Sequence, residues 1–428
     1  MKKIFIWALV TGAILVSCSS EHPAQKISAN EQEIVSYIDA HTNEAIALLE
    51  KTVNIESPTE NLAGVKQVGM VFKDEFASLG FTTKWLEMPV EMKRAGHLLA
   101  EKTGTKGKRI LLLGHLDTVL HGEKFRREGD RGYGTGTSDM KAGDVVILYA
   151  LKALRETGAL KDASVIVLLT GDEENSGLPK AVRLDGMLAA AKRSDLALSF
   201  DGGDKNAASA AIRGQSFWYI EVTAKTGHSS QIFKQDMGSG SIFEAARILN
   251  QFYETLHNEK YLSFNSGLIA GGSEIEDNRT AVITKGRSSV IPAKTIMWGD
   301  LRFISKQQEE AARSRMREIV ARSMPGASAK IFFDDGLPAM SPNEGNNALL
   351  KQLDAVSRGL NFGKVEAIDP TSGGATDISE IAHLVPSLEN LGGIGAGDHA
   401  RDEYVELKTL PMQIKRAALL IYRLTRKN

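Results

Sequence analysis

Cysteine, net charge and long apolar runs are all scarce in this sequence. Cys18 is the only cysteine among 428 residues, which excludes a disulfide within the chain. The 52 lysines and arginines nearly balance the 53 aspartates and glutamates, so the net charge is −1. Basic residues interleaved with aromatics are also lacking, and we therefore expect no binding to nucleic acid. A Gly-Lys-Ser/Thr phosphate loop is absent as well.

The first residues are typical of a targeting segment. Two lysines precede an apolar run over residues 4–16, which is too short to span a membrane comfortably. The run ends in Leu-Val-Ser-Cys at residues 15–18, which resembles the bacterial lipobox. We predict a lipoprotein signal peptide over residues 1–18 and a polar tether over residues 19–30. The predicted location is the bacterial cell envelope, with a lipid anchor at Cys18 and the protein facing the periplasm or the exterior.

Three short apolar runs each end in residues that can bind metal. Continuous apolar runs of this length are typical of strands buried on both faces of a parallel sheet. In such sheets ligands bind beyond the carboxyl ends of the strands. The runs cover residues 109–113, 164–170 and 195–200, and they lead into Gly-His-Leu-Asp, Gly-Asp-Glu-Glu and Asp-Gly-Gly respectively. Packing by itself does not explain this repetition.

The pattern changes between residues 214 and 340. Residues 217–224 alternate between apolar and polar, as in a half-buried antiparallel strand, and helical patterns follow over residues 241–256 and 306–322. We therefore predict an α/β catalytic domain over residues 31–213 and 341–428, with a mixed, mostly parallel sheet and helices on both faces. Residues 214–340 are predicted to form an inserted α+β domain.

The candidate metal ligands are two histidines and three carboxylates. This donor set suits zinc, with cobalt or manganese as alternatives, and the absence of thiolate favours a catalytic site over a closed structural one. Two metals that share one carboxylate can stabilise both oxygens of a hydrolytic transition state. Glu173 lies next to a candidate ligand and is a natural general base. The candidate ligands are His115, Asp139, Glu174, Asp201 and His399.

These motifs, taken in order, resemble the M20 family of metallopeptidases, with the closest likeness to the glutamate carboxypeptidase branch. The resemblance covers essentially the whole mature chain. It is carried by His115-x-Asp117, Gly136-x-x-Asp139-x-Lys141, Asp172-Glu173-Glu174, Asp201, and His399 followed by Glu403-Tyr404-Val405.

The resemblance implies two zinc ions and a role for each ligand. Asp139 would bridge the two ions. His115 and Asp201 would complete one metal site, and Glu174 and His399 the other. The metals would activate a water for attack on an amide carbonyl.

The resemblance also implies the residues that act around the metals. Glu173 would be general base and then general acid, and Asp117 would orient His115. His228 of the insert would reach the reacting carbonyl. Arg302 would hold a substrate carboxylate. The loop with Gly374 and Thr376 would line the substrate site.

The function implied is hydrolysis of the amide bond of short peptides or N-acyl amino acids, by a carboxypeptidase. Residues 214–340 would then form a lid and dimerisation domain, and the protein would be a homodimer. Two departures from the branch are Asp201, which stands where the glutamate carboxypeptidases carry glutamate, and Ser288, which stands where several relatives place asparagine. Asp201 is associated with aminopeptidases and dipeptidases of the family, and these remain the alternative. From another class, the alternative is a non-catalytic lipoprotein that captures peptides or metal. The presence of Glu173 favours the enzyme.

Overall fold

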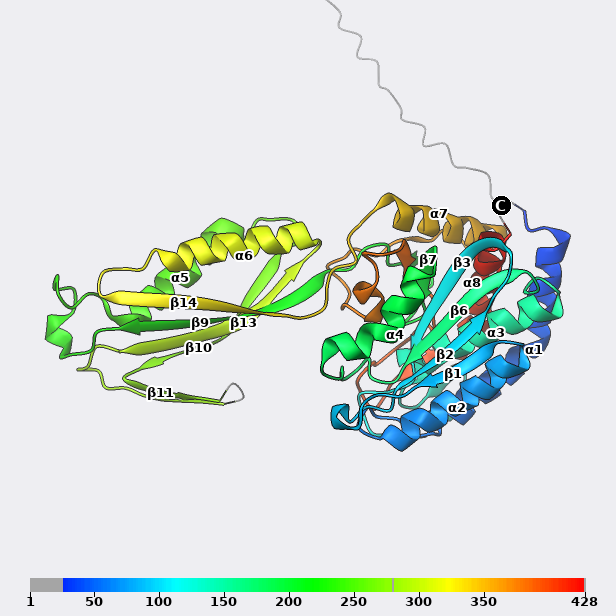
Figure 1. The fold of residues 1–428 in the computed structure, drawn as a ribbon, viewed down its shortest axis with the longest axis horizontal. Coiled ribbons are helices and arrows are strands. Elements are labelled where there is room, and N and C mark those ends of the chain that lie inside the picture. Colours follow the sequence, from blue (N-terminus) through cyan, green and yellow to red (C-terminus); the bar gives the residue numbers. More distant parts are fainter. Residues whose placement is uncertain (1–25, 279–280, 427–428) are drawn as a thin grey trace, which may run out of the picture.

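The computed structural model describes residues 26–278 and 281–426. They form two domains that lie side by side, with the inserted domain projecting from the larger one (Figure 1). The predicted signal peptide, with Cys18, and most of the predicted tether lie outside the described residues. None of the described helices is long and apolar enough to cross a membrane.

The larger domain is built on a six-stranded sheet. Five of its strands run in one direction and only β2 runs against its neighbours. This arrangement confirms the predicted mixed, mostly parallel sheet. In spatial order the strands are β1 (Thr82–Leu86), β2 (His97–Lys102), β6 (Ala163–Thr170), β3 (Lys106–His115), β7 (Leu196–Ser199) and β16 (Ser387–Leu388).

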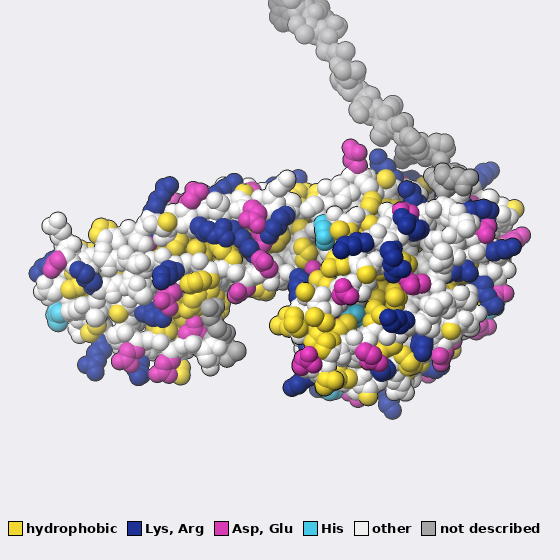
Figure 2. Space-filling view, viewed as in Figure 1, with side chains coloured by type: hydrophobic (Ala, Val, Ile, Leu, Met, Phe, Trp, Pro, Cys, Tyr) yellow, Lys and Arg dark blue, Asp and Glu magenta, His cyan; other side chains and the backbone are white. Residues whose placement is uncertain are grey.

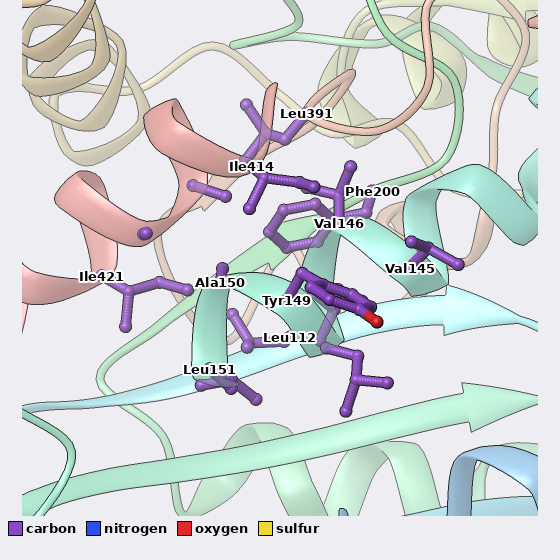
Figure 3. Close-up of a cluster of buried hydrophobic side chains, with 14 of the residues drawn as sticks. Leu112, Val145, Val146, Tyr149, Ala150, Leu151, Phe200, Leu391, Ile414 and Ile421 are labelled. Atoms are coloured by element: carbon purple, nitrogen blue, oxygen red, sulfur yellow. The ribbon is translucent and has the colours of Figure 1, made fainter. Parts of the chain in front are cut away.

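Helices cover both faces of this sheet. The apolar side chains of its central strand point alternately to one face and the other, so both faces must be buried. Ile110 and Leu112 of β3 belong to the main hydrophobic core, whereas Leu111 and Leu113 pack on the other face. The main core is completed by α1 (Ala29–Val53), α2 (Leu62–Ser78), α3 (Ala142–Glu156), α7 (Glu344–Gly359) and α8 (Leu410–Leu424), and the other face is covered by α4 (Lys180–Lys192). Figure 3 shows side chains of α3 packed between Leu112 of β3 and Ile414 of α8.

The first helix begins earlier than the sequence pattern predicted. The tether was expected to extend to residue 30, but α1 starts at Ala29. Ser28 accepts a hydrogen bond from the backbone N–H of Glu31, and the Glu31 carboxylate accepts one from the backbone N–H of Ser28. This reciprocal capping box satisfies two donors at the helix start, and the helix therefore includes the last two residues of the predicted tether.

Small strands complete the larger domain near the predicted site. β17 (Gly395–Ala396), β18 (Tyr404–Glu406), β5 (Arg131–Tyr133) and β4 (Arg126–Glu128) form one antiparallel sheet, and β8 (Ala207–Ala208) pairs with β15 (Glu366–Ala367). The pairing of β18 with β5 brings the last part of the chain next to the loop that carries Asp139.

The insert has a sheet and a core of its own. Four antiparallel strands lie in the order β10 (Ser263–Gly272), β13 (Lys294–Phe303), β9 (Gly214–Ala224) and β14 (Ala327–Asp335). Helices α5 (Gly240–Leu256) and α6 (Lys306–Ala321) cover one face, around a core that includes Trp218, Phe252 and Met316. The hairpin of β11 (Glu274–Asp277) and β12 (Val282–Lys285) lies on the other side of this sheet (Figure 1). Figure 2 shows a deep hollow between the two domains.

Candidate metal centre

The candidate ligands come together at the carboxyl edge of the six-stranded sheet. His115 is the last residue of β3, Glu174 follows β6, and Asp201 follows β7. Because β6, β3 and β7 are adjacent and parallel, their ends meet at one place. Asp139 comes from the loop before α3, with a cis peptide bond to Met140, and His399 comes from the loop between β17 and β18.

Asp139 lies between the two histidines. Its Oδ1 is 3.0 Å from Nε2 of His115, and its Oδ2 is 3.1 Å from Nε2 of His399. Asp201 is 3.9 Å from the first of these nitrogens, and Glu174 is 3.2 Å from the second. Two sets of three donor atoms result, each within 4.8 Å, and Asp139 belongs to both. The predicted grouping of the five residues is therefore the grouping that the geometry shows.

The ring of His115 is oriented so that its Nε2 atom is available to bind a metal. Its Nδ1 is 3.1 Å from the backbone oxygen of Asp117 and 3.5 Å from that residue's carboxylate, so Nε2 points to the other ligands. A second partner of this kind fixes the tautomer of a metal-bound histidine. Both residues are buried.

The electrostatics of the cluster also fit divalent cations. Burial, together with the neighbouring Asp139 carboxylate, raises the pKa of Glu174 to about 8 and that of Asp201 to about 7. A hydrogen bond to Asp139 raises the pKa of His399 to about 9. Carboxylates crowded in a buried site are costly without cations beside them, and two divalent ions would remove this repulsion. The donor set and its charge therefore fit a pair of metals.

Glu173 stands beside the ligands without belonging to either set of three. Burial raises its pKa well above the ordinary value, and the nearby carboxylates of Asp201 and Asp377 add to this effect. Asp117 holds the loop in place, because its two oxygens accept the backbone N–H groups of Glu173 at 3.1 Å and Glu174 at 3.2 Å. Asp117 thus connects His115 with the candidate base.

Glu403 is a positioning residue that the sequence motif contained but to which we assigned no role. Its carboxylate is buried and accepts the backbone N–H groups of Gly136 at 2.7 Å, Ser138 at 2.8 Å and Asp139 at 3.0 Å. These bonds hold the loop that presents the shared ligand. The position of Glu403, four residues after His399, is the only sequence feature we see that could have indicated this role.

A buried ion triad lies behind the base. Arg183 of α4 donates to Asp172 at 2.9 Å and to Asp377 at 2.6 Å, and all three side chains are buried. The triad joins the loop that carries Glu173 to the loop that carries Thr376. Sequence reasoning did not identify Arg183, because nothing local distinguishes it from any helical arginine.

Four of the five candidate metal ligands, all except His115, line a cavity of about 330 Å³. Gly374 and Thr376 line it as predicted, together with Glu173. His228 and Arg302 do not line it. His228 is exposed in the insert, with its Nδ1 2.9 Å from Oγ of Ser230, and Arg302 pairs with Asp300 at 3.0 Å. Within one chain, the structure therefore does not bring these two predicted residues to the metal ligands.

A second arginine, which sequence reasoning missed, lies near Arg302 where the domains join. Arg213 donates to Oγ of Ser263 at 2.9 Å, and Ser263 is the cross-strand partner of Arg302. It also donates to the backbone oxygen of Thr371 at 3.3 Å, in the loop that leads to the cavity. Arg213 thus connects the inserted sheet to the wall of the candidate site.

An α/β domain with two carboxylate-linked sets of metal ligands at its carboxyl edge defines a metal-dependent hydrolase. The sequence profile of Peptidase family M20/M25/M40 matches residues 111–423, and the chain belongs to this family of metallopeptidases. The non-catalytic alternative finds no support in this relationship.

The comparisons with known proteins agree with this assignment. Carboxypeptidase G2 from Pseudomonas sp. (strain RS-16) is 30% identical over 392 residues, which is 88% of either chain. Aminopeptidase PepT from Bacillus cereus has a similar fold, with a TM-score of 0.71 over 90% of this chain and 99% of its own, at 17% identity. The YXEP protein of Bacillus subtilis, a dinuclear metal-binding peptidase of the M20 family, gives a TM-score of 0.61 over 90% of this chain and 99% of its own, at 14% identity.

Proposed function

We propose that this protein is a dinuclear zinc exopeptidase that hydrolyses the amide bond of short peptides or N-acyl amino acids, acting as a carboxypeptidase. The observation that carries the proposal is the position of Asp139, whose two oxygens each face a different histidine at 3.0 and 3.1 Å. Such sharing of a carboxylate is what a two-metal hydrolytic site requires. Cobalt or manganese could replace zinc with the same donors.

The residues around the ligands divide the chemistry between them. When bound, the two ions would supply Lewis acidity, lowering the pKa of a water and polarising the scissile carbonyl. Glu173 takes the proton of the attacking water on its carboxylate and delivers it to the departing amine nitrogen. Burial raises the pKa of this carboxyl, which favours its holding the proton between the two transfers. Asp117 fixes the position of the Glu173 backbone and the orientation of the His115 ring.

The free carboxylate of the substrate would be bound from the inserted domain. Arg302 is the predicted partner, and Arg213 adds a second guanidinium near it. Guanidinium groups bind carboxylates in a bidentate manner. The likeness to carboxypeptidase G2 supports this polarity. Arg302 lies on the inserted domain, and Arg213 directly precedes the first strand of that domain. Closure of the two domains would therefore complete this part of the site.

Asp201 favours a second candidate, a dipeptidase or aminopeptidase of the same family. The two readings differ in which end of the peptide must be free. The test is hydrolysis, by metal-loaded enzyme, of dipeptides blocked at the amino end or at the carboxyl end. A carboxypeptidase tolerates the amino block and loses the carboxyl-blocked substrate. Cleavage only of the carboxyl-blocked peptides would establish aminopeptidase polarity instead.

Two further proposals concern the assembly. We infer a homodimer formed through the inserted domain, since His228 is exposed and would act on the site of a partner subunit as an oxyanion donor. We also infer a lipid anchor at Cys18, on the strength of the lipobox-like residues 15–18. The protein would then be held at a bacterial membrane, outside the cytoplasm.

A further inference from the structure

One wall of the cavity carries a buried carboxylate to which the proposed chemistry assigns no role. Glu389 directly follows β16, at the same sheet edge as the metal ligands, and its side chain lines the cavity. The residue is only 2% exposed. Two backbone hydrogen bonds with Ser209, of 2.9 and 3.1 Å, fix its position.

Glu389 has no cationic partner among the described residues. Its Oε1 accepts hydrogen bonds from the hydroxyls of Thr376 at 2.5 Å and Ser199 at 3.4 Å, and Oε2 receives none from the described chain. Among the other buried acids, Asp172 and Asp377 share Arg183, and Glu309 pairs with Arg313 at 2.6 Å. Asp144 is buried without a hydrogen-bond partner within the ranges that the structure describes, but it does not line the cavity. A buried carboxylate without a counter-ion is costly, so its retention at a cavity wall points to a ligand.

The neighbouring hydroxyls make this wall rich in hydrogen-bond acceptors. The Thr376 hydroxyl donates its proton to Glu389, and the Ser209 hydroxyl donates to Oδ1 of Asn390 at 3.0 Å. Because each hydroxyl has already used its proton, its oxygen can only accept from a group in the cavity. No lysine or arginine lines this cavity in the described part of the chain. A group with several N–H donors and a positive charge fits this wall.

We propose that Glu389, with the Thr376 and Ser209 oxygens, binds the free ammonium group of the substrate. The proposal rests on the proposed amide hydrolysis and narrows its substrate to short peptides with an unblocked amino end, in place of N-acyl amino acids. A primary ammonium has three N–H donors, which matches the three acceptors. With Arg302 of the inserted domain and Arg213 directly before it at the other end, the site selects a zwitterionic peptide of limited length. An enzyme that binds both the free carboxylate and the free ammonium group of its substrate would act as a dipeptidase.

The test compares matched substrates on the metal-loaded, full-length mature protein. The substrates are Ala-Xaa dipeptides and the same dipeptides with an N-acetyl group, which share one scissile bond. Glu389→Gln keeps the shape of the side chain and its acceptor for Thr376, but it removes the charge. Hydrogen bonds to charged groups correspond to about 10- to 100-fold in affinity. We expect kcat/KM on the free dipeptides to fall by that factor, mainly through KM, with the N-acetyl forms changed less than about twofold.

Glu366→Gln is the matched control, because it makes the same exchange at an exposed residue paired with Lys364, away from the cavity. It should leave the ratio between the two substrate sets unchanged. Metal content by elemental analysis and thermal unfolding should show that Glu389→Gln remains folded and loaded.

Three outcomes would overturn the proposal: an equal loss on both substrate sets, no loss on either, or a wild-type preference for the N-acetyl forms. No loss on either would mean that Glu389 is neutral and donates a hydrogen bond, since glutamine also donates. Calorimetric titration with the same peptides tests the ammonium site separately from the proposed hydrolysis. If wild-type protein cleaves neither set but binds free dipeptides at least tenfold more tightly than Glu389→Gln does, the hydrolysis fails and the ammonium site stands. Equal binding would remove the site as well.

Discussion

The Glu403 carboxylate accepts the backbone N–H of Asp139 at 3.0 Å, across 264 residues of sequence. Glu403 also accepts the N–H groups of Gly136 and Ser138, so its removal frees the loop that presents the shared ligand. We expect Glu403→Ala to weaken metal binding about 10- to 100-fold, as the loss of supporting contacts around metal ligands typically does. Glu403→Gln, which keeps one acceptor oxygen, should lose less. Competition with a chelator measures both. Metal affinity unchanged in Glu403→Ala would contradict the positioning role.

Glu173→Gln should bind metal normally and lose most of its turnover. The amide cannot take a proton from the attacking water, and general acid–base catalysis typically contributes ~10²–10⁴-fold. The variant keeps the backbone N–H that Asp117 accepts, so the loop should stay in place. Elemental analysis and kcat are to be measured on one preparation. Full activity with full metal would rule out Glu173 as the base.

The metal-free protein should lose stability as the pH rises from about 5 to 8. The pKa of Glu174 is raised from 4.5 to about 8 and that of Asp201 from 3.8 to about 7, so the folded state holds protons that the unfolded state has released. Stability then falls with pH across this window. His399, raised from 6.5 to about 9, acts in the same direction.

Metal should reverse this trend, because binding displaces these protons and improves as they leave. Thermal unfolding at pH 5 and pH 8, with chelator and with zinc, checks both statements. A chelated protein that is more stable at pH 8 than at pH 5 would show that the acid cluster is not protonated as described.

His228→Ala should lower kcat strongly and change KM less, with metal still bound. The reason is that His228 lies outside both sets of metal ligands and would act only on the developing oxyanion, where the loss of one donor costs about 10²–10³ in kcat. Mixed dimers of His228→Ala and Glu173→Gln provide the sharper measurement. If His228 acts on the partner's site, one composite site in each mixed dimer is intact and partial activity returns. No recovery, in dimers shown to exchange subunits, would exclude action across the dimer.

Cys18→Ala should release the protein from the membrane fraction. The lipobox-like residues 15–18 would lose the thiol that carries the lipid, and the remaining apolar run is too short for a stable span. Cell fractionation followed by detection of the protein measures the change. Membrane association as tight as in the wild type would argue for an uncleaved anchor.

Sequence pattern predicted the catalytic sheet and three of the five candidate metal ligands. Apolar runs that end in histidine or acidic residues reveal both a buried parallel strand and its ligand edge, because one short segment carries both signals. His115, Glu174 and Asp201 were found in this way, and their meeting in space follows from the adjacency of β6, β3 and β7. The same pattern at Glu389, after the two-residue β16, was too short to be read.

Contacts between distant segments had to come from the tertiary structure. Glu403 supports Asp139, Arg183 joins Asp172 to Asp377, and Arg213 meets the strand of Arg302 only because the chain returns to these places after long intervals. The sequence by itself determined which residues could bind metal, since ligand chemistry belongs to each side chain. The tertiary structure decided which acids have a counter-ion and which face a cavity without one, because burial and charge pairing are properties of the packed chain.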